Sequence, residues 1–311
     1  MKKFRKILVA VLTIAMIAAL GACSKQETAT TDTPDTTTET NTQDTTTPEP
    51  TETAEPTDTA EPAGDLSGTI TITGSTSVEK PLTAMIDEFM ALNPDVTINY
   101  TGTGSSAGIS DTIAGANDIG ASSRELKDEE KVDGLNQVTF AFDGIAVAVN
   151  PANPVADLTI EDLAKIYSGQ ITNWKDVGGN DADIIVVSRE GASGTRSAFE
   201  ELIKLEDAGG LVEDATVVEG NGNVQTNVAG NANAIGYVSF SFIDESVKGI
   251  NVNEVEGTPE NAKAGTYPLS RPFLFVYMND KATPVVQAFV DFALSEDGQG
   301  FVAEHGGIRV D

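Results

Sequence analysis

Hydrophobic residues recur along this chain with two alternating periods, one typical of strands and one typical of helices. The run Thr69–Thr73 reads Thr-Ile-Thr-Ile-Thr and predicts a strand with one apolar face. The segment after Ser77 has helical spacing and ends at Asn93-Pro94. The residues that share one face of this predicted helix are Leu82, Met85, Ile86 and Phe89.

The same order of strand and helix continues toward the C-terminus. Further strands are expected at 96–100, 117–121, 138–150, 184–187 and 234–238. Further helices are expected up to Ala114, at 159–167, up to about Leu205 and at 283–295. This alternation predicts an α/β fold with mostly parallel sheets. Ligands bind such sheets beyond the carboxyl ends of the strands.

Three similar loops rich in serine and threonine fall at those strand ends. They read Gly74-Ser75-Thr76-Ser77, Gly104-Ser105-Ser106 and Ala192-Ser193-Gly194-Thr195, and a predicted helix follows each one. The first N–H groups of a helix lack partners within the helix, and its dipole adds about half a positive charge at that end. Any one such loop is typical of a simple helix cap. Three in one domain predict a site for a small oxyanion.

The charge of the chain limits which anions it can attract. The formal net charge is −29. The first 22 residues contribute +4 and residues 23–65 contribute −10, which leaves −23 for residues 66–311. Such a surface repels a nucleic-acid backbone, so no nucleic-acid partner is expected. An anion site here must rely on short-range dipoles and on one or two arginines.

The N-terminal region has the features of an export signal followed by a tether. Basic residues precede the apolar run Ile7–Leu20, which is too short to span a bilayer comfortably. The sequence Leu20-Gly21-Ala22-Cys23 resembles the lipobox of bacterial lipoproteins. We therefore expect a signal peptide at 1–22, lipidation of Cys23 and anchoring to the outer face of the cell membrane. Residues 24–65 hold no Ile, Leu, Val, Met or aromatic residue, which predicts a disordered tether over 23–65.

Several ordered motifs resemble the phosphate-binding proteins of bacterial phosphate ABC importers. The resemblance covers about residues 68–311, and its strength lies in the order and spacing of the motifs. They are Thr73-Gly74-Ser75-Thr76-Ser77-Val78, Tyr100 to Gly108, Asp118 to Glu125, Asp143 to Pro151, Leu163 to Trp174, Arg189 to Arg196, and Ala234-Ile235-Gly236-Tyr237-Val238.

The resemblance implies a two-lobed periplasmic-binding-protein fold, type II-like, with mixed sheets flanked by helices and a two-strand hinge. It places lobe one at about 66–145 plus 241–311 and lobe two at about 146–240. It implies a monomer that binds inorganic phosphate outside the cytoplasm and delivers it to the transmembrane subunits of an ABC permease, without a cofactor or metal. The phosphate-binding residues that it implies are Thr76, Ser77, Ser105, Arg189, Ser193, Gly194 and Thr195.

One position departs from the pattern of this family. Well-known members have an aspartate after Gly-Ala-Ser, whereas this chain has Ser123 followed by Arg124. A buried acceptor matters because monohydrogen phosphate can donate a proton and sulfate cannot. We expect Asp143 to supply the acceptor, with Glu190 as the second candidate, and Arg124 to add a second cation to the site.

Other classes of function stay open at this point. A hydrolase with Ser193 or Ser77 as nucleophile would need a nearby base, and the sole histidine, His305, lies near the C-terminus. The sequence therefore favours a binding protein over an enzyme. A binding protein for sulfate, molybdate or tungstate, or a tethered surface interaction module, are the alternatives.

Overall fold

The computed structural model describes residues 66–311, so the predicted signal peptide, Cys23 and the tether lie outside the described residues. The strands are β1 (Gly68–Gly74), β2 (Val96–Gly102), β3 (Ile119–Ser122), β4 (Leu135–Val149), β5 (Asp157–Leu158), β6 (Ile185–Arg189), β7 (Thr216–Val218), β8 (Ala234–Ser239), β9 (Lys248–Val252) and β10 (Ser270–Met278). The helices are α1 (Glu79–Leu92), α2 (Ser105–Ile113), α3 (Ile160–Tyr167), α4 (Gly194–Leu202), α5 (Gly220–Gly230), α6 (Pro259–Lys263), α7 (Pro284–Leu294) and α8 (Glu296–Glu304). No helix within 66–311 is both long and apolar enough to cross a membrane.

The strands follow the order β2-β1-β3-β10-β4-β8-β6-β7, with β9 beside β4 and β5 beside β9. Strands β1, β2 and β3 are parallel, as are β6, β7 and β8. Strand β10 is antiparallel to β3 and β4, and β4 is antiparallel to β8 and β9. The α/β class is confirmed, and the sheet is mixed because β4 and β10 run against their neighbours.

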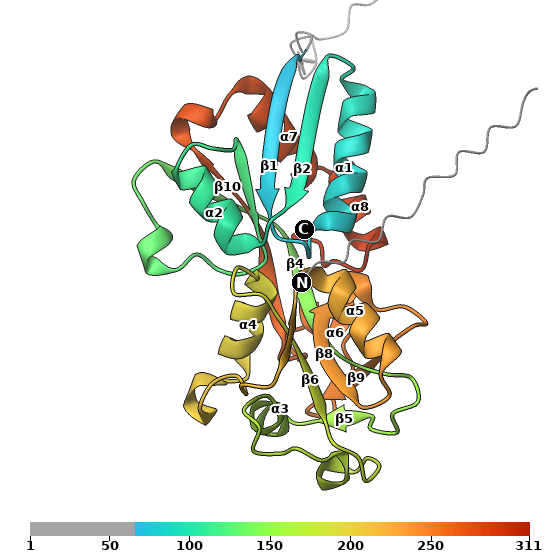
Figure 1. The fold of residues 1–311 in the computed structure, drawn as a ribbon. Helices are drawn as coiled ribbons and strands as arrows, with labels where there is room; N and C mark the ends of the chain where they lie inside the picture. The colour runs from blue at the N-terminus through green and yellow to red at the C-terminus, as the bar shows by residue number, and fades with distance from the viewer. Residues whose placement is uncertain (1–65) are drawn as a thin grey trace, which may run out of the picture. The chain divides into compact units, whose positions relative to one another are not determined.

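Two hydrophobic cores divide these elements into two halves (Figure 1). The first half contains β1, β2, β3 and β10 with α1, α2, α7 and α8, and its core includes Ile70, Phe89, Phe275 and Phe289. The second half contains β5 to β9 with α3 to α6, and its core includes Tyr167, Trp174, Phe199 and Tyr237. This is the two-lobed periplasmic-binding-protein fold that the resemblance implies.

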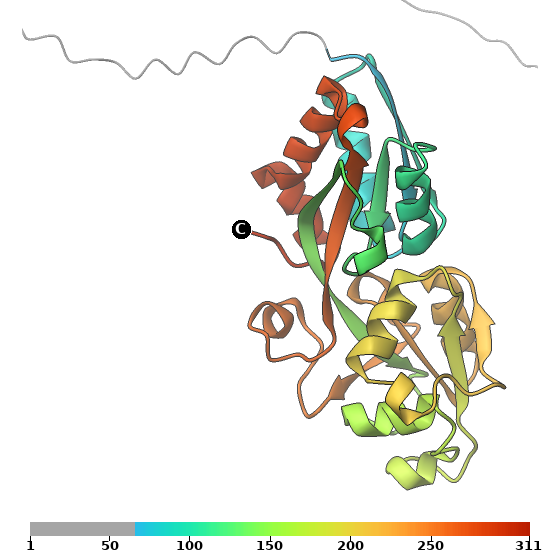
Figure 2. The same cartoon turned by 90° about the vertical axis from the view of Figure 1, so that its left-hand side faces the viewer.

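Two strands join the halves (Figure 2). Residues 135–144 of β4 pair with β10 in the first half, and residues 145–149 pair with β8 and β9 in the second. The chain returns where β10 begins, and there the Ile145 N–H donates to the Leu269 carbonyl at 2.7 Å. The predicted two-strand hinge is therefore β4 and β10.

The packing of residues 241–269 differs from the expected division. We expected this segment in lobe one, but Phe242, Val247, Ile250 and Leu269 pack in the core of the second half. The physical reason is strand β9, which pairs with the second part of β4 and holds this segment there. The chain leaves the second half near residue 270 instead of near 240.

Candidate functional site

Four helices begin where the two halves meet. The N-termini of α1 and α2 come from the first half, and those of α4 and α5 come from the second. The Ser77 and Thr195 hydroxyls lie 2.8 Å apart, and the Ser106 N–H donates to the Ala192 carbonyl at 3.1 Å. Because helix N-termini present N–H groups and positive dipole ends, this junction favours a negative ligand.

The first loop is held in place by its own serine. Gly74 has φ +144°, and a Cβ on it would lie 2.0 Å from a carbonyl oxygen of β3, so only glycine fits there. The Ser75 hydroxyl accepts from the Ser77 N–H at 3.1 Å and donates to the Ser123 hydroxyl at 2.7 Å. These bonds fix Thr76 and Ser77 immediately before α1.

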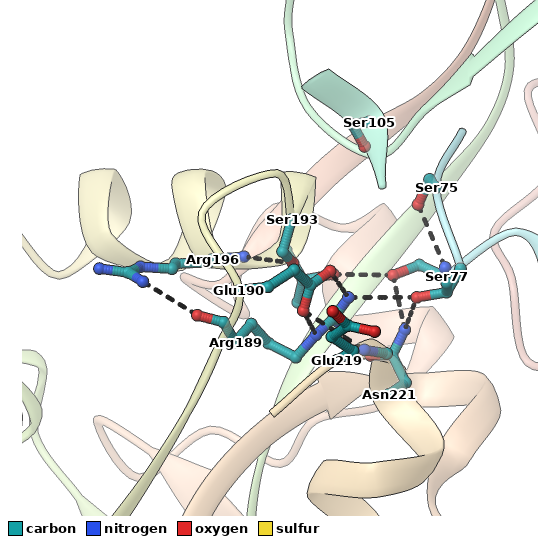
Figure 3. Close-up of polar contacts among 12 residues, drawn as sticks. Ser75, Ser77, Ser105, Arg189, Glu190, Ser193, Arg196, Glu219 and Asn221 are labelled. Atoms are coloured by element: carbon teal, nitrogen blue, oxygen red, sulfur yellow. Dashed lines mark hydrogen bonds and ion pairs between the residues drawn. The ribbon is translucent and has the colours of Figure 1, made fainter. Parts of the chain in front are cut away.

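Arg189 ends strand β6 and is 1% exposed. Its Nε and Nη2 donate to the Glu190 carboxylate at 2.9 and 2.8 Å, and Nη2 also donates to Thr76 Oγ1 at 3.2 Å (Figure 3). Among residues 66–311, its buried Nη1 has no hydrogen-bond partner. Burial acts to raise the pKa of Glu190, but the bonds from Arg189 outweigh it and the pKa lies below its ordinary value. Arg189 is therefore a fixed cation, and the two N–H groups of its Nη1 are left to satisfy.

A second buried ion pair lies at the hinge. Arg271 of β10 donates to Asp143 of β4 through Nη2 at 2.8 Å and Nε at 3.2 Å. The same guanidinium donates to Ser77 Oγ at 3.0 Å and lies 3.4 Å from Ser123 Oγ. Burial raises the pKa of Asp143, and Arg271 together with the Ser239 hydroxyl opposes that rise.

Asn221 connects the second half to the first loop. It is fully buried in the first turn of α5, and its Nδ2 donates to Thr76 Oγ1 at 3.2 Å and to Ser77 Oγ at 3.1 Å (Figure 3). Its Oδ1 accepts from the Ser239 N–H at 3.1 Å. The first loop is therefore bound by Arg189 and Asn221 from the second half and by Arg271 from the hinge.

The remaining predicted hydroxyls lie at the starts of α2 and α4. The Ser105 hydroxyl accepts from the Ser123 N–H at 3.0 Å, and the Ser193 hydroxyl caps α4 by accepting from the Arg196 N–H at 3.1 Å. Gly194 approaches Ser105 so closely that a Cβ would lie 2.1 Å from the serine oxygen. The structure therefore brings Thr76, Ser77, Ser105, Arg189, Ser193, Gly194 and Thr195 to one junction, with Asp143 behind them through Arg271.

Arg124 is placed differently from these residues. Its guanidinium donates to both oxygens of Glu130 at 2.7 Å and to the Ser106 hydroxyl at 3.0 Å. Burial acts to raise the pKa of Glu130, but the bonds from Arg124 and the Lys127 N–H leave it below its ordinary value. Arg124 therefore forms an ion pair with Glu130 and a hydrogen bond to the first turn of α2. Its direct contact with an anion stays a prediction.

Arg271, Asn221 and Ser239 were not expected from the sequence. Arg271 is a lone cation next to the apolar run Phe273–Tyr277, which is a signal that could have identified it. Asn221 lies in Gly220-Asn221-Gly222-Asn223, where glycine and asparagine favour a turn over a helix. Both belong to elements, β10 and α5, that the hydrophobic pattern did not predict.

The chemistry of this junction is that of hydrogen-bond donation to an anion. Two guanidinium groups, several hydroxyls and the N-termini of four helices face it, and both carboxylates are bound by arginine. His305, the only histidine, lies at the C-terminus of α8. Residues 66–311 contain no group of three or more His, Cys, Asp and Glu side chains placed to hold a metal ion.

A two-lobed α/β fold with a donor-rich junction beside a two-strand hinge defines a substrate-binding protein of the periplasmic type. A comparison of the sequence with known families matches the PBP superfamily domain to residues 31–297. The phosphate-binding protein PstS of Bacillus subtilis (strain 168) is 35% identical over 250 residues, which cover 78% of this chain and 81% of that protein. The corresponding protein of Borreliella burgdorferi is 33% identical over 246 residues, covering 76% and 88%. The chain therefore belongs to the PBP superfamily and, within it, to the PstS family.

Solved structures agree with this assignment. A putative phosphate ABC transporter substrate-binding protein from Clostridium perfringens, solved with bound phosphate, is 46% identical with a TM-score of 0.76. It is matched over its whole length by 78% of this chain. An ABC-type phosphate transport receptor from Vibrio cholerae is 42% identical with a TM-score of 0.67, covering 77% of this chain and 99% of that one. The names of these relatives are those of binding and transport proteins, not of enzymes.

Proposed function

We propose that this chain is an extracytoplasmic receptor that binds inorganic phosphate between its two halves. It delivers the ligand to the transmembrane subunits of an ABC importer and catalyses no reaction. Lipid on Cys23 anchors it to the outer face of the membrane, and it acts as a monomer. The names of the relatives support this proposal. One is a phosphate-binding protein, one is a transporter substrate-binding protein solved with bound phosphate, and one is a phosphate transport receptor.

The single observation that carries the proposal is the buried Nη1 of Arg189, which is unpaired within residues 66–311. A guanidinium that is 1% exposed keeps its buried Nη1 without a partner among the described residues. Leaving such a donor unsatisfied costs about 1–3 kcal/mol or more for a charged group. An oxyanion oxygen beside Thr76 would satisfy Nη1, and the N–H groups at the start of α4 would serve the other oxygens.

The closed arrangement also supports binding between the halves. Thr76 and Ser77 of the first half are bonded to Arg189, Asn221 and Thr195 of the second. A ligand that contacts both sets of groups stabilises the closed state over an open one, and hinge motion about β4 and β10 then couples binding to closure.

The test is calorimetric titration of the full chain in detergent, after unfolding and refolding to remove any carried ligand. We expect phosphate to bind at micromolar or lower concentration and sulfate to give little heat. Equal binding of phosphate and sulfate would make the chain a broader oxyanion carrier. No heat from either anion would contradict the proposal and favour a tethered surface module.

A further inference from the structure

Lys80 reaches from the first half of the molecule to the second. It is the second residue of α1, and its Nζ donates to the Ser241 carbonyl at 2.6 Å. The same Nζ lies 4.6 Å from the centre of the Phe242 ring, which is within the range of a cation–π contact. Phe242 packs in the core of the second half. One cation therefore joins the two halves through a carbonyl oxygen and an aromatic ring.

The partners of Lys80 are fixed to the second half. They belong to the 3₁₀ turn Phe240–Phe242, which follows β8 directly. The Gln225 side chain of α5 donates to the Phe242 carbonyl at 2.9 Å, and the Ser239 hydroxyl accepts from the Ser241 N–H at 3.3 Å. The turn therefore moves together with α5 and β8.

The other end of the contact lies beside the anion-binding loop. Thr76 and Ser77 precede α1, and Lys80 lies in the first turn of that helix. A cation is disfavoured there, because the helix dipole already places positive charge at the N-terminus. The local energetics of α1 therefore do not account for a lysine at this position, whereas its contacts with Ser241 and Phe242 offset that cost.

We propose that Lys80 is a positioning residue that holds the closed halves together and so slows the release of the bound anion. This inference rests on the proposed function. Release requires the halves to separate, because the proposed site lies between them. Separation moves α1 away from the turn Phe240–Phe242 and breaks both contacts of Lys80. Lys80 thus acts on dissociation without touching the anion.

The charge of Lys80 has a second effect that must be separated from this one. Any cation on an acidic protein attracts an anion through space. Such attraction acts on the association rate constant, whereas contacts that break on opening act on the dissociation rate constant. The two rate constants therefore distinguish a steering charge from a residue that holds the halves together.

The experiment measures both rate constants for inorganic phosphate on the refolded full chain in detergent. Exchange spectroscopy of the ³¹P signal gives koff, calorimetry gives Kd, and their ratio gives kon. Lys80→Gln removes the cation and keeps a polar side chain. Its koff should rise about tenfold, the size of one net hydrogen bond, while kon changes little.

Two further variants test the chemistry of the contact. Lys80→Arg keeps the charge, the donors and the cation–π contact, so it should restore koff close to the wild-type value. Lys131→Gln is the matched control, because Lys131 is exposed and pairs with Asp128, three residues away in the chain. It removes the same charge and should leave koff unchanged.

Hydrogen exchange at one backbone amide reports closure independently of the rate constants. The Ser106 N–H at the start of α2 donates to the Ala192 carbonyl of the second half at 3.1 Å, so opening of the halves exposes it to solvent. With saturating phosphate, Lys80→Gln should exchange this proton about tenfold faster than the wild type, in proportion to koff. The Leu82 N–H, which donates to the Val78 carbonyl within the start of α1, should keep its rate and so show that α1 is intact.

The outcomes separate this inference from the proposed function. If the wild type binds no phosphate, the proposed function itself fails. If the wild type binds phosphate and Lys80→Gln keeps its koff and its Ser106 exchange rate, the role of Lys80 is overturned and the receptor function stands. A lower kon with an unchanged koff also overturns it, because Lys80 would then be a steering charge. Thermal unfolding of each variant confirms that it is folded before its rates are compared.

Discussion

Removing the Arg189 guanidinium should nearly abolish phosphate binding. In Arg189→Ala the site loses a buried cation that is held in place by Glu190 and bonded to Thr76. A hydrogen bond to a charged group contributes about 1.5–3 kcal/mol, so two such bonds to an anion give about 3–6 kcal/mol. At 1.4 kcal/mol for each tenfold change, Kd should rise by about two to four orders of magnitude.

Arg189→Ala should change the free energy of unfolding less than it changes the free energy of phosphate binding. Glu190 loses its cation but its side chain is about one-fifth exposed, so water replaces part of the interaction. Urea unfolding should therefore show a lower free energy of unfolding but a folded protein at room temperature. Arg189→Lys keeps the positive charge and loses the planar fork, and it should bind phosphate with intermediate affinity.

The assay is isothermal calorimetry on refolded, ligand-free protein, with Arg309→Ala as the matched control. Arg309 is a partly exposed arginine that pairs with Asp311 at the chain end, so its removal should leave Kd unchanged. A Kd for Arg189→Ala within error of the wild type would refute the assignment of Arg189 to the anion site.

Three further predictions concern closure, the hinge and the acid range. Gly194→Ala places a Cβ 2.1 Å from Ser105 Oγ, so it should block closure and weaken phosphate binding with little effect on the free energy of unfolding. Gly222→Ala is the control, because its new Cβ meets nothing within 4 Å, and titration should show unchanged phosphate affinity. Asp143→Asn breaks a buried ion pair, so urea unfolding should show a free energy of unfolding lower by about 3–5 kcal/mol. Because Asp143 is the predicted acceptor of the ligand proton, the same variant should weaken phosphate binding more than sulfate binding. Burial acts to raise the pKa of Glu190, but the hydrogen bonds from Arg189 hold that pKa below its value in the unfolded chain. The ionised carboxylate therefore stabilises the fold at pH values above the unfolded pKa, and this stabilisation is lost as the pH falls through the folded pKa. Glu190→Gln should therefore flatten the acid side of a plot of stability against pH, and an unchanged slope would contradict the role of this pair.

The strand and helix pattern predicted much of the fold because local periodicity reports which face is buried. The strand expected at 69–73 is β1, and the helix expected after Ser77 is α1. The long extended segment expected at 138–150 is β4, which is the first hinge strand. Its passage from one core to the other is a tertiary property that periodicity does not carry.

The three serine loops and Arg189 could be predicted because each follows a strand and precedes a helix. Asn221 could not, since its glycine-rich surroundings favour a turn, and α5 packs against β4, β6 and β8, which are distant in the chain or follow it. Arg271 could not be placed either, because its partners Asp143 and Ser77 are 128 and 194 residues away in the chain. Contacts at such separations depend on how the sheet is ordered, which the local pattern does not specify.

The most direct measurement of the central claim is a crystal structure of the purified chain grown with phosphate. We expect one tetrahedral anion between the two halves, within hydrogen-bonding distance of Arg189 Nη1 and of the first N–H groups of α4. We also expect the anion to contact the Thr76 hydroxyl. Phosphate bound elsewhere, or Arg189 turned away from the anion, would contradict the proposed site.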